Sequence, residues 1–273
     1  MPSFTTSDGL NLHFDDQGDG APVLCLAGLT RNGDDFAYLL PHLAGHRVIR
    51  LDYRGRGLSD YATDWSTYTI PTEARDVIEL LDHLGLERVS IIGTSRGGLV
   101  AMALASMAPE RLDRVIFNDI GPVIDMAGLG RIMAYVGTSA PLPDLEAGAR
   151  QLAAAHAADF PGVPLDRWRT EAAARWTAGP EGLTLRYDAH LRDALMAVAG
   201  QPAPPDPWAF FAPMTGLPLG VIRGANSDLL SAETLAEMHK RHPGMRSVTV
   251  PDRGHVPFLD EPEALALIHD VLS

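Results

Sequence analysis

The stretch Val89-Ser-Ile-Ile-Gly93-Thr94-Ser95-Arg96-Gly97-Gly98-Leu99-Val100 decides the fold expected of this chain. An apolar, β-branched run leads into Gly-x-Ser-x-Gly, and a run rich in Ala, Met and Leu follows it. This order is typical of a sharp strand-to-helix turn, which strains the backbone of the middle residue and exposes its hydroxyl group. Gly93 and Gly97 are small, so the strand and the helix can cross closely there. Ser95 is therefore a candidate nucleophile beside the free N–H groups of a helix start.

Composition sets the bounds of the interpretation. The chain has 273 residues, of which 46% are hydrophobic and 21% are charged, so it can bury a substantial core as one large domain or as one domain with an insertion. Its formal net charge of −13 argues against nucleic acids and anionic membrane surfaces as partners. We find no membrane-spanning run and no secretory signal. Cys25 is the single cysteine, and we expect a cytoplasmic location.

Strand-like and helix-like segments alternate from Pro22 to Asp119, which predicts a mostly parallel sheet with helices on both faces. One of the predicted helices lies near residues 34–43. Residues 122–212 break the alternation, because they are Ala-rich, helical in pattern and without a clear β-branched strand. The alternation resumes at 217–223. We therefore expect a core domain formed by residues 1–121 and 213–273, with residues 122–212 as an insertion.

Two further reactive side chains follow predicted strands. Asp228 comes after the strand at 217–223, and His255 comes after the strand at 246–250. The carboxyl ends of parallel strands meet at one crevice, so these residues are expected to join Ser95 there. A serine hydroxyl attacks well only when an imidazole takes its proton, and the imidazole needs a carboxylate to orient it. We predict a catalytic triad of Ser95, His255 and Asp228.

An attacked carbonyl also needs donors for the negative charge that develops on its oxygen. The backbone N–H groups of Leu29 and Arg96 are the candidates for this oxyanion hole. The side chain of Arg96 opposes the helix dipole, so we expect it to pair with an acidic side chain of the protein. The alternative partner is a carboxylate on the substrate, for which Arg31 is a second candidate anchor.

The insertion holds three of the four tryptophans, which are Trp168, Trp176 and Trp208. Large aromatic side chains lose little rotamer entropy when they are buried, which suits the walls of a substrate pocket. We predict that these three residues contact the substrate. The alternative is that they only seal the insertion against the core domain.

These motifs together resemble the α/β-hydrolase fold along nearly the whole chain. The resemblance rests on five motifs, namely Gly28-Leu29, Asp52-x-Arg-Gly-x-Gly-x-Ser59, Gly93-x-Ser95-x-Gly97, Arg223-Gly-x-x-x-Asp228 and Gly254-His255 with Pro257-Phe258 and Glu261-Pro262. It implies eight strands, with 122–212 as a helical cap inserted after the sixth. The chain departs from the family in having Ala27 where a histidine usually precedes the glycine of the oxyanion loop. Some members carry their triad acid after the sixth strand, where Asp119 lies, but we prefer Asp228.

The sequence thus predicts a cytoplasmic serine hydrolase that cleaves a small-molecule carboxylic ester through an acyl-enzyme, without a metal or an organic cofactor. A serine nucleophile argues against the dehalogenase and epoxide-hydrolase branches, which use aspartate. A carbon–carbon bond hydrolase, a lactonase or a thioesterase would use the same triad, and a non-enzymatic receptor for a small ligand is the alternative from another class. His239 and His242 lack a third ligand nearby, so we expect no metal site. Homo-oligomer formation stays open.

Overall fold

An eight-stranded sheet forms the centre of the computed structural model, which describes residues 2–138, 141–200 and 206–273. The order across the sheet is β1-β2-β4-β3-β5-β6-β9-β10. The two pairs that involve β2 are antiparallel, and the other five pairs are parallel. The predicted class, an α/β protein with a mostly parallel sheet, is confirmed. The strands are β1 (Ser3–Thr5), β2 (Asn11–Gln17), β3 (Ala21–Leu26), β4 (His46–Leu51), β5 (Val89–Thr94), β6 (Leu112–Asn118), β9 (Leu219–Gly224) and β10 (Arg246–Val250).

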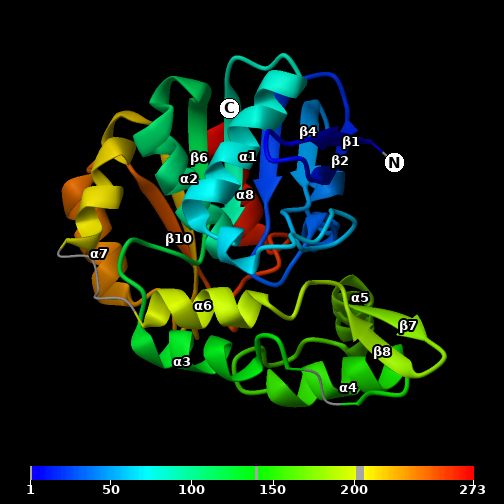
Figure 1. Ribbon diagram of the computed structural model, residues 1–273. Coiled ribbons are helices and arrows are strands. Elements are labelled where there is room, and N and C mark those ends of the chain that lie inside the picture. Colours follow the sequence, from blue (N-terminus) through cyan, green and yellow to red (C-terminus); the bar gives the residue numbers. More distant parts are fainter. Residues whose placement is uncertain (1, 139–140, 201–205) are drawn as a thin grey trace.

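Helices cover both faces of this sheet (Figure 1). Successive residues of a strand point to opposite faces, so Leu24 and Leu26 of β3 join one buried cluster, while Val23 and Cys25 join the other. The first cluster includes residues of α1 (Ile70–His83), α2 (Arg96–Met107) and α7 (Ala232–Arg241). The second includes residues of α8 (Pro262–Leu272) and of the short 3₁₀ helices η1 (Gly33–Phe36) and η2 (Leu40–His42). No helix among the residues described is long and apolar enough to span a membrane.

The prediction of a helix near residues 34–43 is wrong. The chain forms η1 and η2 there instead of one α-helix. Pro41 cannot donate the backbone hydrogen bond that the interior of an α-helix requires, so a continuous helix cannot run through it. Asn32 begins η1 by accepting a hydrogen bond from the backbone N–H of Asp34 at 3.0 Å.

The chain leaves the sheet after β6 and returns to it at β9, and the described parts of residues 122–212 lie along one end of the sheet (Figure 1). The described parts of this insertion are mainly helical, as predicted. They also contain one hairpin that was not expected, because its strands are short and carry few β-branched residues. The elements are α3 (Met126–Tyr135), α4 (Leu145–Ala155), α5 (Leu165–Arg175), β7 (Trp176–Gly179), β8 (Gly182–Leu185) and α6 (Leu191–Ala199).

Backbone hydrogen bonds join the insertion to the loop that follows β4. The Gly57 N–H donates to the Arg186 carbonyl, and the Asp188 N–H donates to the Gly55 carbonyl, each at 2.8 Å.

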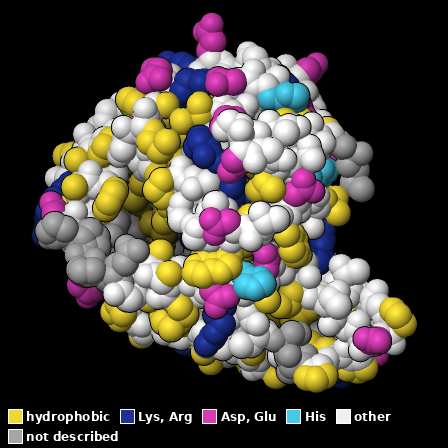
Figure 2. Space-filling view, in the orientation of Figure 1, with side chains coloured by type: hydrophobic (Ala, Val, Ile, Leu, Met, Phe, Trp, Pro, Cys, Tyr) yellow, Lys and Arg dark blue, Asp and Glu magenta, His cyan; other side chains and the backbone are white. Residues whose placement is uncertain are grey.

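The space-filling view in Figure 2 shows acidic and basic side chains interspersed over the face of the molecule seen in Figure 1. The described residues visible there form no continuous basic surface, which agrees with the net charge of −13.

The turn between β5 and α2 depends on its glycines. A Cβ atom at Gly97 would lie 2.0 Å from the carbonyl oxygen of Leu26, and one at Gly93 would lie 2.7 Å from the backbone of Gly97. Only glycine fits where the backbones of β3, β5 and α2 approach so closely. This close crossing places Ser95 at the carboxyl end of the sheet.

Candidate active site

Ser95 occupies the strained turn that the sequence predicts. Its backbone has φ 50° and ψ −113°, a conformation that non-glycine residues rarely adopt. Its side chain does not cap α2. The Ser95 N–H donates to the carbonyl of Asn118 at 2.9 Å, which fastens the turn to the end of β6. The hydroxyl group is therefore free to face the imidazole of His255.

His255 connects Ser95 to a buried carboxylate. It lies in the loop between β10 and α8, and its Nε2 is 2.9 Å from the Ser95 Oγ. Its Nδ1 is 2.8 Å from Oδ2 of Asp119. A carboxylate only accepts hydrogen bonds when ionised, so Nδ1 carries a proton and Nε2 is left to accept the serine proton. The predicted meeting of Ser95 and His255 is found in the structure.

Asp119 directly follows β6 and is completely buried. Its φ of 58° lies in the left-handed region, which aspartate tolerates better than most residues. Oδ1 accepts the Gly224 N–H at 2.8 Å, and Oδ2 accepts the Ser227 hydroxyl at 2.6 Å as well as the His255 ring. These donors fix the position of the carboxylate beside the imidazole.

The prediction that Asp228 contacts His255 is wrong. The Asp228 carboxylate instead accepts a hydrogen bond from Arg131 Nε at 2.5 Å. The neighbouring residue, Ser227, is the one that turns inward, and it bonds to Asp119. β6 and β9 are adjacent parallel strands, so both aspartates end at the same edge of the sheet, and the path of the loop decides which one reaches the histidine. The sequence signals for Asp119 were its position directly after an apolar strand and the resemblance to family members that carry their triad acid after the sixth strand.

The two expected oxyanion donors lie on either side of Ser95. Arg96 is the first residue of α2, and Leu29 follows Gly28, where an added Cβ atom would lie 3.9 Å from Cβ of Ser95. The hydrogen bonds found across the described residues leave the N–H groups of Leu29 and Arg96 without an acceptor. Both donors are therefore available to a substrate oxygen.

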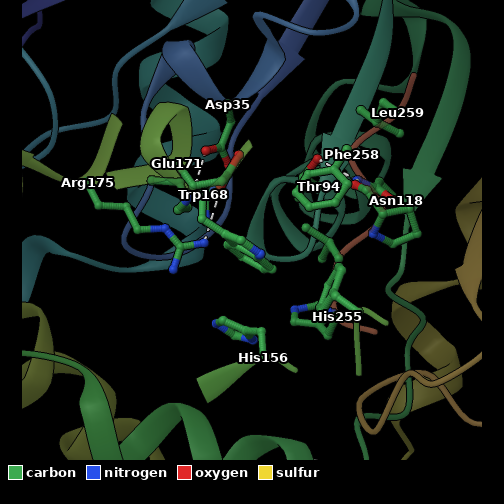
Figure 3. A pocket seen from close by; sticks show the side chains of 14 residues that line it. Asp35, Thr94, Asn118, His156, Trp168, Glu171, Arg175, His255, Phe258 and Leu259 are labelled. Carbon is green, nitrogen blue, oxygen red and sulfur yellow. Dashed lines mark hydrogen bonds and ion pairs between the residues drawn. The ribbon is translucent and has the colours of Figure 1, made fainter. Parts of the chain in front are cut away.

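A pocket with a cavity volume of about 50 Å³ lies beside His255 (Figure 3). Such a volume holds a few water molecules or a small organic group. Arg31 and Trp168, two of the residues predicted to contact the substrate, line it. The lining also includes Asp35, Thr94, Asn118, His156, Phe160, Glu171, Arg175, Val256, Pro257, Phe258 and Leu259.

Trp168 forms part of an aromatic wall. Its ring stacks on His156 with the ring centres 5.4 Å apart and an interplanar angle of 7°. It meets the rings of Phe160 and Phe258 edge-on. Burial lowers the pKa of His156 to about 4, so this imidazole is neutral near pH 7.

Trp176 and Trp208 do not line this pocket, which corrects their predicted role. Trp176 packs against α4, where an added Cβ at Gly148 would be 3.2 Å from its ring. Trp208 lies edge-on to Phe211, and the guanidinium group of Arg241 covers its ring at 4.4 Å. Trp208 therefore serves the alternative role, sealing the insertion against the core.

We expect Trp168→Ala to change substrate preference and Trp208→Ala to leave it unchanged. Removal of the Trp168 ring enlarges the pocket, so kcat/KM should rise for longer acyl chains relative to shorter ones, by about 10-fold or more across the series. Trp208→Ala should lower the melting temperature and give a profile parallel to the parent. The measurement is kcat/KM over a graded acyl series. Parallel profiles for both variants would show that the pocket does not select the acyl group.

The side chain of Arg96 has the acidic partner that was predicted. Its guanidinium group donates to both oxygens of Glu73, at 2.6 and 3.0 Å. Glu73 is completely buried and also pairs with Arg56 at 2.8 Å. A buried carboxylate held by two arginines offsets the unfavourable position of Arg96 at the helix start. This ion pair leaves no role for Arg96 as a substrate anchor.

A group of four charged residues forms another wall of the pocket. Arg31 donates to Asp35 through Nε and to Glu171 through a terminal nitrogen at 2.6 Å. Arg175 donates to the same Glu171 oxygen at 3.2 Å. Burial raises the pKa of Asp35 to about 6 despite the nearby Arg31. We call Arg31, Asp35, Glu171 and Arg175 the charged wall.

No group of three or more His, Cys, Asp or Glu side chains that could hold a metal ion is found in the described parts of the chain. His239 Nε2 instead lies 2.7 Å from the Ser247 hydroxyl, and His242 Nε2 lies 2.9 Å from the Leu217 carbonyl. The two histidines therefore bind neighbouring residues of the core domain.

The chain is similar to a known protein family, to known proteins and to solved structures. The sequence profile of the alpha/beta hydrolase fold matches residues 21–262. A 3-hydroxybutyrate-oligomer hydrolase of Cupriavidus necator is 35% identical over 255 residues, which cover 90% of this chain and 86% of that protein. A 2-(acetamidomethylene)succinate hydrolase of Mesorhizobium japonicum is 27% identical, with coverage of 90% and 85%. The crystal structure of an alpha/beta hydrolase from Novosphingobium aromaticivorans superposes with a TM-score of 0.93 at 40% identity, covering 99% of this chain and 96% of that one.

Proposed function

Since this chain belongs to the alpha/beta hydrolase fold family, we propose that it is a serine hydrolase that cleaves a small-molecule carboxylic ester through an acyl-enzyme. The observation that carries the proposal is the continuous chain of hydrogen-bonding atoms from Ser95 through His255 to Asp119, with separations of 2.9 and 2.8 Å. A nucleophile, a base and an orienting carboxylate at these distances are what acyl transfer requires.

The mechanism follows from these contacts. His255 Nε2 takes the Ser95 proton as Oγ attacks the ester carbonyl, and the buried Asp119 stabilises the imidazolium that forms. The N–H groups of Leu29 and Arg96 bind the oxygen of the tetrahedral intermediate. His255 then gives its proton to the departing alcohol. A water molecule repeats the sequence on the acyl-enzyme and releases the acid.

An ester substrate agrees with one relative in particular. Units of 3-hydroxybutyrate in an oligomer are joined through hydroxyl and carboxyl groups, so the hydrolase named for that oligomer acts on ester bonds. A thioesterase, a lactonase or a carbon–carbon bond hydrolase would use the same triad and differ in the group that leaves. A receptor of the same fold would bind its ligand without turnover.

We further propose that residues 122–212 form a cap over the core domain of residues 1–121 and 213–273. The contribution of Trp168, Glu171 and Arg175 to the pocket supports this division.

We also propose a cytoplasmic location. It agrees with the single cysteine, Cys25, which is buried and has no disulfide partner.

The proposed function predicts ordinary turnover and a single reactive serine. The protein should hydrolyse 4-nitrophenyl esters of short acids, and a fluorophosphonate should attach once per chain, on the peptide that contains Ser95. The measurements are release of nitrophenolate and mass mapping of the labelled peptide. Absence of both turnover and labelling would contradict the proposal and favour the receptor.

A further inference from the structure

Arg175 has more hydrogen-bond donors than the protein uses. A guanidinium group carries five N–H bonds, and the one side-chain acceptor found for Arg175 among the residues described is Glu171, at 3.2 Å. Its Nε is buried and has no acceptor in the described residues. Arg175 is also the last residue of α5, where the C-terminal end of the helix dipole favours a cation. The helix therefore holds an under-used guanidinium group at the pocket.

The other arginine of the charged wall is already occupied. Arg31 donates to Asp35 and to Glu171 through two different nitrogens, so both acidic side chains have a partner besides Arg175. The side chains of Asp35 and Glu171 are 6% and 5% exposed, whereas that of Arg175 is 24% exposed. The side chain of Arg31 is 17% exposed but is already bound to both carboxylates, so Arg175 is the most exposed member of the charged wall and the one with donors left for a ligand.

The pocket joins this cation to the base of the triad. Arg175 and His255 line the same cavity, and Trp168 and His156 lie between them in the view of Figure 3. His255 thus lines one part of the pocket, aromatic rings line another, and the charged wall with its part-exposed Arg175 lines a third. A ligand that matches all three parts has an acyl group, a short apolar spacer and an anionic end.

We propose that the substrate is an ester that also carries a free carboxylate, and that Arg175 binds this carboxylate. The inference rests on the proposed ester hydrolysis and names the class of ester. A carboxylate can accept two parallel hydrogen bonds from one guanidinium group. A substrate carboxylate would therefore supply the Arg175 N–H groups with acceptors that Glu171 alone does not supply. His156 is neutral and stacked on Trp168, so it adds a polar edge to the pocket without a competing charge. Arg175 is therefore a specificity residue for the anionic end of the substrate.

The test compares two esters of the same shape. Methyl hydrogen succinate carries a free carboxylate, and methyl succinamate carries a neutral amide in its place. Acid release from each is followed by pH-stat for the parent, Arg175→Gln and Arg175→Lys. The parent should prefer the carboxylate, and Arg175→Gln should lower kcat/KM for that ester by about 10- to 100-fold, the value of a charge-assisted pair. The amide should change by less than about threefold, and Arg175→Lys should recover part of the loss.

The matched control is Arg169→Gln. Arg169 lies on the same helix but pairs with Glu146 and Asp166 on the surface, so its loss should affect both esters equally and slightly. Equal losses on the two esters in Arg175→Gln would overturn the inference, because they would show that Arg175 only supports the fold. A parent without preference for the carboxylate would also overturn it.

Binding without turnover separates this inference from the proposed function. Butyrate and butyramide are titrated calorimetrically into the parent and into Arg175→Gln, which does not require an active triad. Binding of butyrate at least 10-fold tighter than butyramide in the parent, with this preference lost in Arg175→Gln, supports the anchor even if no ester is hydrolysed and the proposed function fails. A preference that persists in Arg175→Gln would place the carboxylate elsewhere and overturn the inference. Equal affinities would refute the anchor, even if neutral esters are hydrolysed rapidly.

Discussion

Ser95→Ala is expected to lower kcat by about 10⁶-fold, as complete removal of the nucleophile does in other triads. The loss should fall on kcat rather than on KM, because the pocket walls that bind the substrate remain in place. Fluorophosphonate labelling should disappear together with turnover. The measurement combines steady-state kinetics on an activated ester with the mass of the treated protein.

The fold should tolerate this change. The Ser95 side chain does not cap α2, and within the described part of the chain its one side-chain hydrogen bond is to His255. The substitution does not relieve the backbone strain at position 95, because alanine is also strained at a positive φ. Ser106→Ala is the matched control, because Ser106 is an exposed serine of the same helix, α2. Labelling that survives Ser95→Ala would place the nucleophile elsewhere.

The sequence identifies the parts of this site that depend on local rules. Gly-x-Ser-x-Gly between an apolar strand and a small-residue helix specifies the turn, because any Cβ at Gly97 would collide with the Leu26 carbonyl. The carboxyl ends of parallel strands also meet in every such sheet, which brings His255 to Ser95. Both arguments follow from the order of strands, turns and helices along the chain and require no choice between two candidate side chains.

The identity of the triad acid depends on contacts between residues that lie far apart in the sequence. Asp119 and Asp228 both follow strands that are neighbours in the sheet, so position alone does not separate them. The loop after β9 turns Ser227 inward and Asp228 outward, where Arg131 of the insertion meets it. This partner lies 97 residues away in the chain, and no periodicity in the sequence records it. The tryptophans show the same limit, since only packing decides that Trp168 faces the pocket and Trp208 does not.

Asp119→Asn is expected to lower kcat by about 10⁴-fold, the loss seen when a triad acid becomes an amide elsewhere. The amide oxygen can still accept the Gly224 N–H that now binds Oδ1. The NH₂ group then replaces Oδ2 beside His255 and can only donate to Nδ1. Nδ1 must therefore become an acceptor, so the ring proton moves to Nε2. In this tautomer, the imidazole cannot take the proton of Ser95.

Asp228→Asn supplies the matched comparison. It makes the same replacement of one carboxylate oxygen by NH₂ at the same edge of the sheet, but the partner of Asp228 is Arg131, whose side chain is 57% exposed. Such an ion pair contributes about 0–1 kcal/mol to stability, so kcat should stay within about threefold of the parent. The measurement is kcat at saturating ester for both variants, with melting temperatures to show that each is folded. A large loss in Asp228→Asn together with a small loss in Asp119→Asn would mean that His255 turns to the loop after β9 during the reaction, and that Asp119 only supports the fold.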